Sequence, residues 1–206
     1  MVEKGELTVP GIDFELDKLH EECGVFGIYS HKDDVALNTY WGLYALQHRG
    51  QESTGIVTTD GSNMQVKKGM GLVADVYKDG VGDLTGHIAI GHVRYSTTGS
   101  SMAYRDGVVF QTTVDTEVVL SLIARSRKEK VEDRVAEAVN EIKGAFAILI
   151  MTDHKLIAVR DPYGFRPLCL GKLDGGWVVA SESCAFDLVG AEFIRDVKPG
   201  EMLVFE

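Results

Sequence analysis

The sequence predicts an α+β domain in which antiparallel sheets pack against helices. Short apolar runs separated by turn signals dominate both ends of the chain, and this pattern is typical of hairpins. Helical periodicity is clustered between these ends. This order favours a layered antiparallel arrangement over a doubly wound parallel sheet. Because the sequence shows no internal repeat, linker or low-complexity tract, one domain is the simplest count.

The individual elements can be predicted from spacing. Strands are predicted at 25–29, 55–59, 64–68, 88–95, 145–151, 156–160, 168–171, 177–180 and 202–205. Helices are predicted at 116–125, 131–142 and 184–189, and another starts at Val35 and runs toward Gly50, its expected C-cap. In that first helix one face carries Leu37, Tyr40, Trp41 and Tyr44.

Composition excludes several classes of function. The 206-residue chain is 45% hydrophobic, which is enough for one sizeable core. A formal charge of −10 argues against a nucleic-acid partner or an acidic membrane surface. No apolar stretch approaches the ~20 residues that cross a bilayer, and the N-terminus lacks the pattern of a secretory signal. The three cysteines have no Cys-x-x-Cys spacing, so neither a disulfide framework nor a zinc site is predicted. This use of cysteine fits a reducing cytosol, so a cytoplasmic protein is predicted.

Cys23 has two interpretations. A lone intracellular cysteine before an apolar strand is usually a small buried hydrophobe. A cysteine can also be a nucleophile when a base takes its proton. If Cys23 were the first residue of the mature chain, its own α-amino group, which titrates near ~8, could serve as that base. The motifs elsewhere in the chain favour the nucleophile.

Several motifs occur together in a fixed order. They are Cys-Gly-Val-Phe-Gly-Ile at 23–28, Leu-Gln-His-Arg-Gly-Gln-Glu at 46–52, Gly-His-Val-Arg-Tyr-Ser-Thr at 91–97, Asp-Thr-Glu-Val at 115–118, Arg-Asp-Pro-Tyr-Gly-Phe-Arg-Pro-Leu at 160–168 and Ala-Ser-Glu-Ser-Cys-Ala-Phe-Asp at 180–187. Together they resemble the glutaminase domain of the amidophosphoribosyltransferase family. Members of this family are class II glutamine amidotransferases of purine biosynthesis. The resemblance runs from about Glu21 to the C-terminus.

This resemblance implies a fold and a reaction. The fold would be the four-layer αββα sandwich of antiparallel sheets found in N-terminal-nucleophile hydrolases. Residues 1–22 would be a leader or propeptide, and 23–206 the glutaminase domain. Cleavage after Glu22 would free the amine of Cys23, whose thiol would attack the glutamine amide to give a thioester and ammonia. Water would then release glutamate.

The resemblance also assigns the substrate-binding residues. Arg94 would bind the α-carboxylate of glutamine, because a planar guanidinium can donate two parallel hydrogen bonds to a carboxylate. The alternative for Arg94 is a structural ion pair. Asp115 would accept the α-ammonium group, and it could also cap the helix that follows. Thr97 would line the glutamine pocket, and Arg49 would support the nucleophile. His48 and His92 are not spaced as a metal pair, so no metal site is predicted.

The chain departs from the family in two places. It stops at Glu206, without the phosphoribosyltransferase domain that uses the ammonia, so that domain or subunit would be a partner. The cysteines that hold an iron–sulfur cluster in some members belong to the absent part, so no cofactor is predicted. A homo-oligomer is left open.

The second departure concerns the oxyanion hole. The family has a longer connection with an Asn-Gly pair where this chain has only residues 102–109, so the fold is expected to be shortened there. An oxyanion donor typically contributes ~2.7–4 kcal/mol. The alternative function is therefore a catalytically impaired glutamine-binding or structural remnant of the domain. A third interpretation is a related hydrolase acting on another amide, against which Arg94 and Asp115 argue.

Overall fold

The computed structural model describes residues 23–95 and 115–206. The predicted leader at 1–22, Thr97 and the shortened connection at 102–109 lie outside the described residues. So do the side chains of Asp115 and Thr116. The predictions for these residues are therefore not tested by the structure.

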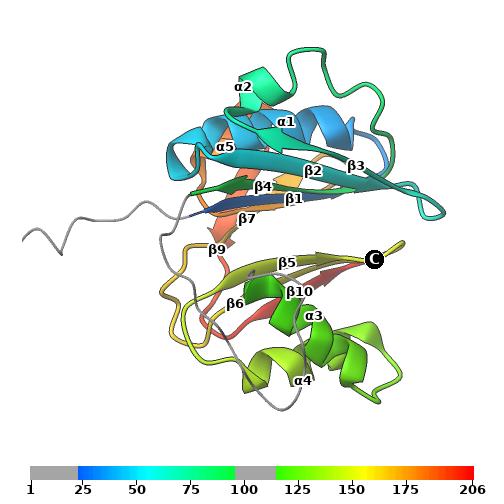
Figure 1. The fold of residues 1–206 in the computed structure, drawn as a ribbon, viewed down its shortest axis with the longest axis vertical. Coiled ribbons are helices and arrows are strands. Elements are labelled where there is room, and N and C mark those ends of the chain that lie inside the picture. The colour runs from blue at the N-terminus through cyan, green and yellow to red at the C-terminus, as the bar shows by residue number, and fades with distance from the viewer. Residues whose placement is uncertain (1–22, 96–114) are drawn as a thin grey trace, which may run out of the picture.

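Two antiparallel sheets form the centre of the molecule (Figure 1). The larger, seven-stranded sheet has the order β3-β2-β4-β1-β8-β7-β9, and the smaller, three-stranded sheet has the order β10-β6-β5. The strands of the larger sheet are β1 (Gly24–Ser30), β2 (Ser53–Thr59), β3 (Met64–Met70), β4 (Ile88–Arg94), β7 (Cys169–Leu173), β8 (Gly176–Ala180) and β9 (Glu192–Asp196). Those of the smaller sheet are β5 (Ala147–Met151), β6 (Leu156–Arg160) and β10 (Met202–Phe205).

Helices cover the outer face of each sheet. The larger sheet is covered by α1 (Val35–Ala45), α2 (Val73–Val76) and α5 (Cys184–Val189), and the smaller sheet by α3 (Asp115–Arg125) and α4 (Val131–Glu141) (Figure 1). The layers therefore follow the order helix, sheet, sheet, helix. The predicted α+β class and four-layer αββα sandwich are confirmed.

Three apolar clusters hold these layers together. Phe26 and Ile28 point from β1 toward α1 and α5, where they meet Leu43 and Phe186. A side chain at Gly42 would collide with the Phe26 ring, so this glycine allows α1 to approach the sheet closely. A second cluster, which includes Leu156 and Val179, fills the space between the sheets. The third lies between the smaller sheet and its helices, around Val135 and Ile157.

The first predicted helix is confirmed, but the face with the regularly spaced apolar residues is not the face that packs against the sheet. Leu37, Trp41 and Tyr44 are 43%, 39% and 47% exposed. The buried residues of α1 are Val35, Ala36, Thr39, Gly42 and Leu43. Because α1 contains no charged residue, hydrophobicity alone does not distinguish its faces. Close packing at Gly42 selects the face that meets β1.

The predicted strands and remaining helices are found within a few residues of their expected ends. Two short elements were not predicted, namely α2 and β9. α2 has only four residues, too few for a helical period, and β9 reads Glu-Phe-Ile-Arg-Asp with its apolar residues exposed. Among the described residues, no helix is long and apolar enough to span a bilayer.

Candidate active site

Cys23 lies at the start of β1, beside the end of β4. The two strands pair antiparallel, with Gly24 opposite Val93, so Cys23 comes next to Arg94 and Tyr95. The backbone N–H of Tyr95 donates to Cys23 Sγ across 3.4 Å. Cys23 is only partly buried. A nucleophile at this position would be held by a neighbouring strand and still be reachable.

The face of the sheet on which Arg94 lies follows from the register. Gly24 and Phe26 point to the outer, helical side, whereas Val25 packs between the two sheets. On β4, Val93 points outward, so His92 and Arg94 alternate to the inner face. Both inner-face residues are exposed although β4 is a central strand. The inner face is therefore accessible near Cys23.

Within the described part of the chain, Arg94 forms an ion pair with Glu52. Its Nε lies 3.5 Å from Glu52 Oε2, and its side chain is 47% exposed. Glu52 Oε2 is itself buried and makes no hydrogen bond within the described part of the chain. This long ion pair neutralises the arginine without fixing it by a short hydrogen bond.

The Gln-His-Arg-Gly motif forms a tight turn against β4. The 3₁₀ helix Gln47–Arg49 ends at Gly50, and the Gln47 side chain closes the turn by donating to Gly50 O at 2.5 Å. A side chain at Gly50 would lie 2.6 Å from the backbone carbonyl carbons of Val93 and Arg94. Gly50 is the C-cap of this helical segment, as predicted, but its φ of −164° is extended and not left-handed. Glycine is needed here for close backbone approach.

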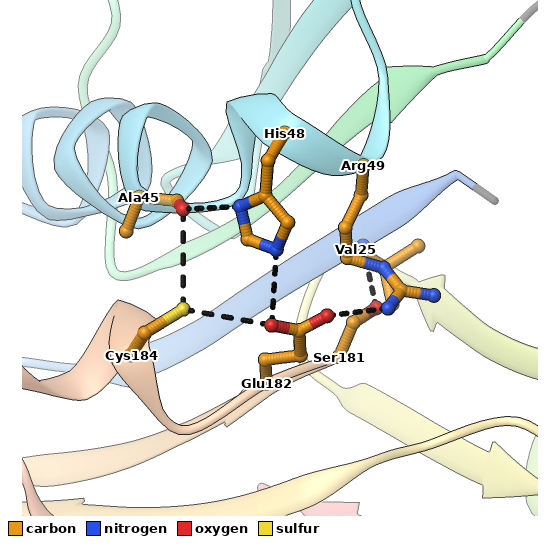
Figure 2. Close-up of polar contacts among 7 residues, drawn as sticks. All are labelled: Val25, Ala45, His48, Arg49, Ser181, Glu182 and Cys184. Atoms are coloured by element: carbon orange, nitrogen blue, oxygen red, sulfur yellow. Dashed lines mark hydrogen bonds and ion pairs between the residues drawn. The ribbon is translucent and has the colours of Figure 1, made fainter. Parts of the chain in front are cut away.

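Glu182 connects this turn to the end of β8 (Figure 2). Arg49 Nη1 donates to Glu182 Oε1 at 2.5 Å, and His48 Nε2 lies 3.0 Å from Glu182 Oε2. His48 Nδ1 lies 3.1 Å from the carbonyl oxygen of Ala45. The Glu182 carboxylate therefore accepts a hydrogen bond from Arg49 and lies within hydrogen-bond distance of the His48 ring.

The charge on Glu182 is favoured by its neighbours. Partial burial raises the pKa of its carboxyl group, but the hydrogen bonds from Arg49 and His48 outweigh this effect and lower it overall. We name Arg49, His48 and Glu182 the Arg-His-Glu cluster. The cluster joins segments 133 residues apart.

Ser181 attaches the same region to the strand that carries Cys23. The N–H of Val25 donates to Ser181 Oγ at 2.9 Å, and the N–H of Ser181 donates to Val25 O at 2.9 Å. Ser181 is 3% exposed. Figure 2 shows the first of these contacts, from Val25 to the Ser181 hydroxyl, beside the Arg-His-Glu cluster. The position of β1 is therefore fixed two residues after Cys23.

The other two cysteines lie in less reactive settings. Burial, followed by the hydrogen bond to Asp196, raises the pKa of the Cys169 thiol to about 12. Burial and the nearby Glu182 also raise the pKa of Cys184. All three cysteines are free. Cys169 is a core residue, at 7% exposure, whereas Cys184 is partly buried.

The structure brings together only some of the predicted site residues. Cys23 and Arg94 lie at adjacent strand ends, and Arg49 lies just behind them, since a side chain at Gly24 would contact its Cβ at 3.5 Å. Asp115 begins α3, which is confirmed as a helix, but its side chain is outside the described residues, as is Thr97. Within residues 23–95 and 115–206, no group of three His, Cys, Asp or Glu could hold a metal ion.

Sequence reasoning missed the roles of Ser181 and Glu182. Their motif, Ala-Ser-Glu-Ser, was recognised but suggested no contact. A charged residue directly after a predicted apolar strand was the only local signal. Its partners could not be identified because they are far away in the sequence.

The sequence of the chain is similar to a known domain family and to several known proteins. Residues 87–187 match a family model described as a glutamine amidotransferase domain. The chain is 46% identical to the amidophosphoribosyltransferase of Rhizobium etli over 226 residues, covering 92% of this chain and 45% of that protein. It is 41% identical to the Bacillus subtilis amidophosphoribosyltransferase, covering 92% of this chain and 47% of that protein. The chain thus spans about half the length of the curated relatives it matches.

Solved structures agree with the sequence matches. The B. subtilis glutamine phosphoribosylpyrophosphate amidotransferase, solved in complex with ADP and GMP, superimposes with a TM-score of 0.81 at 41% identity. That match covers 88% of this chain and 47% of the other. A structure described as the allosteric regulatory enzyme of purine biosynthesis gives the same TM-score of 0.81 at 40% identity.

Proposed function

Because this chain belongs to the glutamine amidotransferase family, in the group of the amidophosphoribosyltransferases, we propose that it hydrolyses the side-chain amide of glutamine with Cys23 as nucleophile. The observation that carries the proposal is the position of Cys23. Its sulfur faces the N–H of Tyr95 and lies beside Arg94, on an accessible face of the sheet.

The reaction would proceed in two steps. The sulfur of Cys23 attacks the amide carbon, a C–S bond forms, and the C–N bond breaks to release ammonia. Water then attacks the thioester, releasing glutamate and restoring the thiol. The α-amine of Cys23, freed by removal of residues 1–22, would take the thiol proton and deliver it to the departing nitrogen.

Charge would orient the substrate. We assign Arg94 to the α-carboxylate of glutamine, since a guanidinium binds a carboxylate through two parallel hydrogen bonds. Its present partner, Glu52, lies 3.5 Å away, so no short hydrogen bond holds Arg94 in place. Asp115 would accept the α-ammonium group and Thr97 would line the pocket. Arg49 would act through the Arg-His-Glu cluster rather than by touching glutamine.

The ammonia would be used by a phosphoribosyltransferase domain or subunit. The relatives are named amidophosphoribosyltransferases, and this chain covers about half of them. In this proposal the chain, residues 23–206, is the glutaminase part of that activity in purine biosynthesis. The synthase reaction would require the second part.

A second candidate function is glutamine binding without efficient turnover. The match to the R. etli protein spans 226 residues, more than the 206 of this chain, so the alignment contains relative residues that have no counterpart here. If these include the Asn-Gly oxyanion pair, the loss would slow the reaction by ~10²–10³.

Measurements of mass, activity and binding on the same preparation test these candidates. Intact mass would reveal removal of residues 1–22, and a glutaminase assay would follow glutamate release. Processing together with glutamate release supports the active enzyme. Calorimetric binding of glutamine without glutamate release supports the impaired form. A preparation that keeps Met1 and neither binds nor hydrolyses glutamine contradicts both, and a faster reaction with another amide would favour a different hydrolase.

A further inference from the structure

Three histidines meet at the end of the sandwich opposite to Cys23. β1 begins directly after Cys23 and ends at Ser30, so His31 follows the far end of that strand. His87 directly precedes β4, which runs antiparallel to β1 and therefore starts at the same far end. His154 lies in the turn between β5 and β6 and so belongs to the smaller sheet.

The backbone of His87 is held on both sides. Its carbonyl oxygen accepts from the N–H of Ser30 at 2.8 Å, and its own N–H donates to Thr59 O at 2.9 Å. On this fixed backbone the His87 ring stacks against the His31 ring, with the centroids 4.7 Å apart and the planes at 13°. Tyr29 meets both rings edge-on, and its hydroxyl oxygen lies 3.2 Å from His31 Nε2. The stacked pair is therefore a fixed part of the larger sheet.

Gly61 brings the third histidine to this pair. It lies in the β2–β3 turn, which Figure 1 shows at the end away from the start of β1. A side chain at Gly61 would lie 3.2 Å from two atoms of the His154 ring and 3.4 Å from Cε1 of His87. Two rings, one from each sheet, thus lie against the same small residue. We name His31, His87 and His154 the histidine cluster, which joins the two sheets.

The acid that faces the cluster does not cancel its charge. Hydrogen bonds from the backbone N–H groups of Asn63 and Ser62 hold the pKa of Asp60 below its ordinary value. Asp60 therefore stays ionised while histidines titrate. Partial burial, and then the charges on His31 and His154, nevertheless lower the pKa of His87, and Asp60 opposes them only in part.

Other charged groups near the cluster are paired elsewhere or exposed. Asp153 precedes His154 in the same turn and is exposed, so solvent screens its charge. The charged residues that follow His31 and His154 have contacts of their own, namely Lys32 with Asp174, Asp33 with the Ser30 hydroxyl, and Lys155 with Glu132 and Glu206. The balance of charge in the cluster is therefore set mainly by the three rings and Asp60.

We propose that the histidine cluster is a pH-dependent contact between the two sheets, closed when its rings are neutral and loosened when they are protonated. Neutral imidazoles stack as aromatic rings, whereas two imidazolium ions at the same separation repel each other. An ordinary histidine titrates near ~6.5. Because the folded protein lowers the pKa of His87, the contact should be complete above that value and be lost as the pH falls through the lower folded one. This proposal does not depend on glutamine hydrolysis.

Hydrogen–deuterium exchange of the full chain tests the loosening directly. Exchange is compared near pH ~7.5 and ~5.5, on either side of the histidine range, and corrected for the intrinsic pH dependence of amide exchange. The β2–β3 turn at 59–64 and the β5–β6 turn at 152–155 should exchange at least ~3-fold faster at the lower pH, from the repulsion of neighbouring charges. Residues 181–183, at the Cys23 end, should not change. The triple variant His31→Gln, His87→Gln, His154→Gln should lose the pH effect.

A histidine titration by NMR tests whether the rings are coupled across the sheets. The His87 signal is identified by its loss in His87→Gln. His31→Gln and His154→Gln should each raise the titration midpoint of His87 by ~0.3–0.6 pH units, because each removes a repelling charge. Ser62→Ala, at an exposed position of the β2–β3 turn, should leave the midpoint unchanged.

The outcomes that overturn the proposal are distinct. His31 and His154 are exposed, so their variants are expected to fold, which circular dichroism can check. Turn exchange that is independent of pH, or that accelerates equally in the triple variant, would show that the histidines do not control the contact. A His87 midpoint that His154→Gln leaves unchanged would show that the cluster does not join the sheets.

Discussion

The two faces of the larger sheet differ sharply at the end that carries Cys23. On the outer face, the turn at Gln47–Gly50 packs tightly against β4, and Arg49 and His48 are both bound to Glu182. On the inner face, His92 and Arg94 are exposed, and the ion pair from Arg94 is long. The contrast suggests that the two faces have different roles. The outer face would hold the nucleophile's strand in place, and the inner face would receive the substrate.

Removing the sulfur should have the largest effect. Cys23→Ala is expected to lower kcat for glutamine hydrolysis by at least ~10³-fold, because the covalent route is lost. Thermal unfolding should be nearly unchanged, since Cys23 is only partly buried. The matched control is Cys169→Ala, which should lose stability but keep activity in the folded protein. Equal activity of Cys23→Ala and the parent would contradict the assignment.

Arg94→Gln should act on substrate binding from the inner face. Losing a charge-assisted hydrogen-bond pair is expected to raise KM for glutamine by ~10–100-fold, corresponding to the usual 1.5–3 kcal/mol. Steady-state kinetics with Glu52→Gln provide the control, because that change removes the competing carboxylate and should leave KM equal or lower. A normal KM for Arg94→Gln would show that the arginine is only a structural ion pair.

Glu182→Gln, on the outer face of the larger sheet, should mainly lower the stability of the folded protein. It replaces the charged carboxylate that contacts Arg49 and His48 with a neutral amide, and losing this charge at a partly exposed site is expected to cost about 1 kcal/mol. We expect a lower free energy of unfolding in urea and a kcat reduced by ~10-fold at most, with KM unchanged. Glu192→Gln, at an exposed position on β9, should change neither quantity. A raised KM without lost stability would place Glu182 at the substrate instead.

The difference in stability between the parent protein and Glu182→Gln should depend on pH. The pKa of Glu182 is lowered in the folded protein by Arg49 and His48, against the opposing effect of burial. Its stabilisation is therefore complete above the unfolded value near ~4.3 and is lost as the pH falls through the lower folded value. The difference in unfolding free energy between the parent and Glu182→Gln should shrink as the pH falls below ~4. A difference that stays constant there would contradict the charged pairing.

Much of the fold could be predicted because its signals are local. The β2–β3 hairpin follows from two strand-like runs around Asp60-Gly61, and β6, α5 and β10 end where the sequence indicates. The buried face of α1 could not be predicted, since this helix has no charged residue to mark its solvent side. That face is chosen by the contact of Gly42 with Phe26, which is visible only after folding.

The candidate site shows the same limit. Cys23 and Arg94 were identified from motifs, and their closeness follows from the pairing of β1 with β4. The contact between Arg49 and Glu182 depends on how the chain returns through β8 after 133 residues. No short-range pattern encodes such a pairing. The need for a glycine at position 50 could not be predicted for a similar reason, because the backbone that requires it belongs to β4.

Covalent labelling of the three cysteines tests the central claim most directly. A glutamine-like electrophile should modify Cys23 alone near neutral pH, because burial raises the pKa of both Cys169 and Cys184. Peptide mass spectrometry should therefore find one adduct, on the peptide that contains Cys23, and an excess of glutamine should suppress it. Labelling of Cys169 or Cys184 instead, or a Cys23 adduct that glutamine does not suppress, would contradict a glutamine-binding nucleophile at this position.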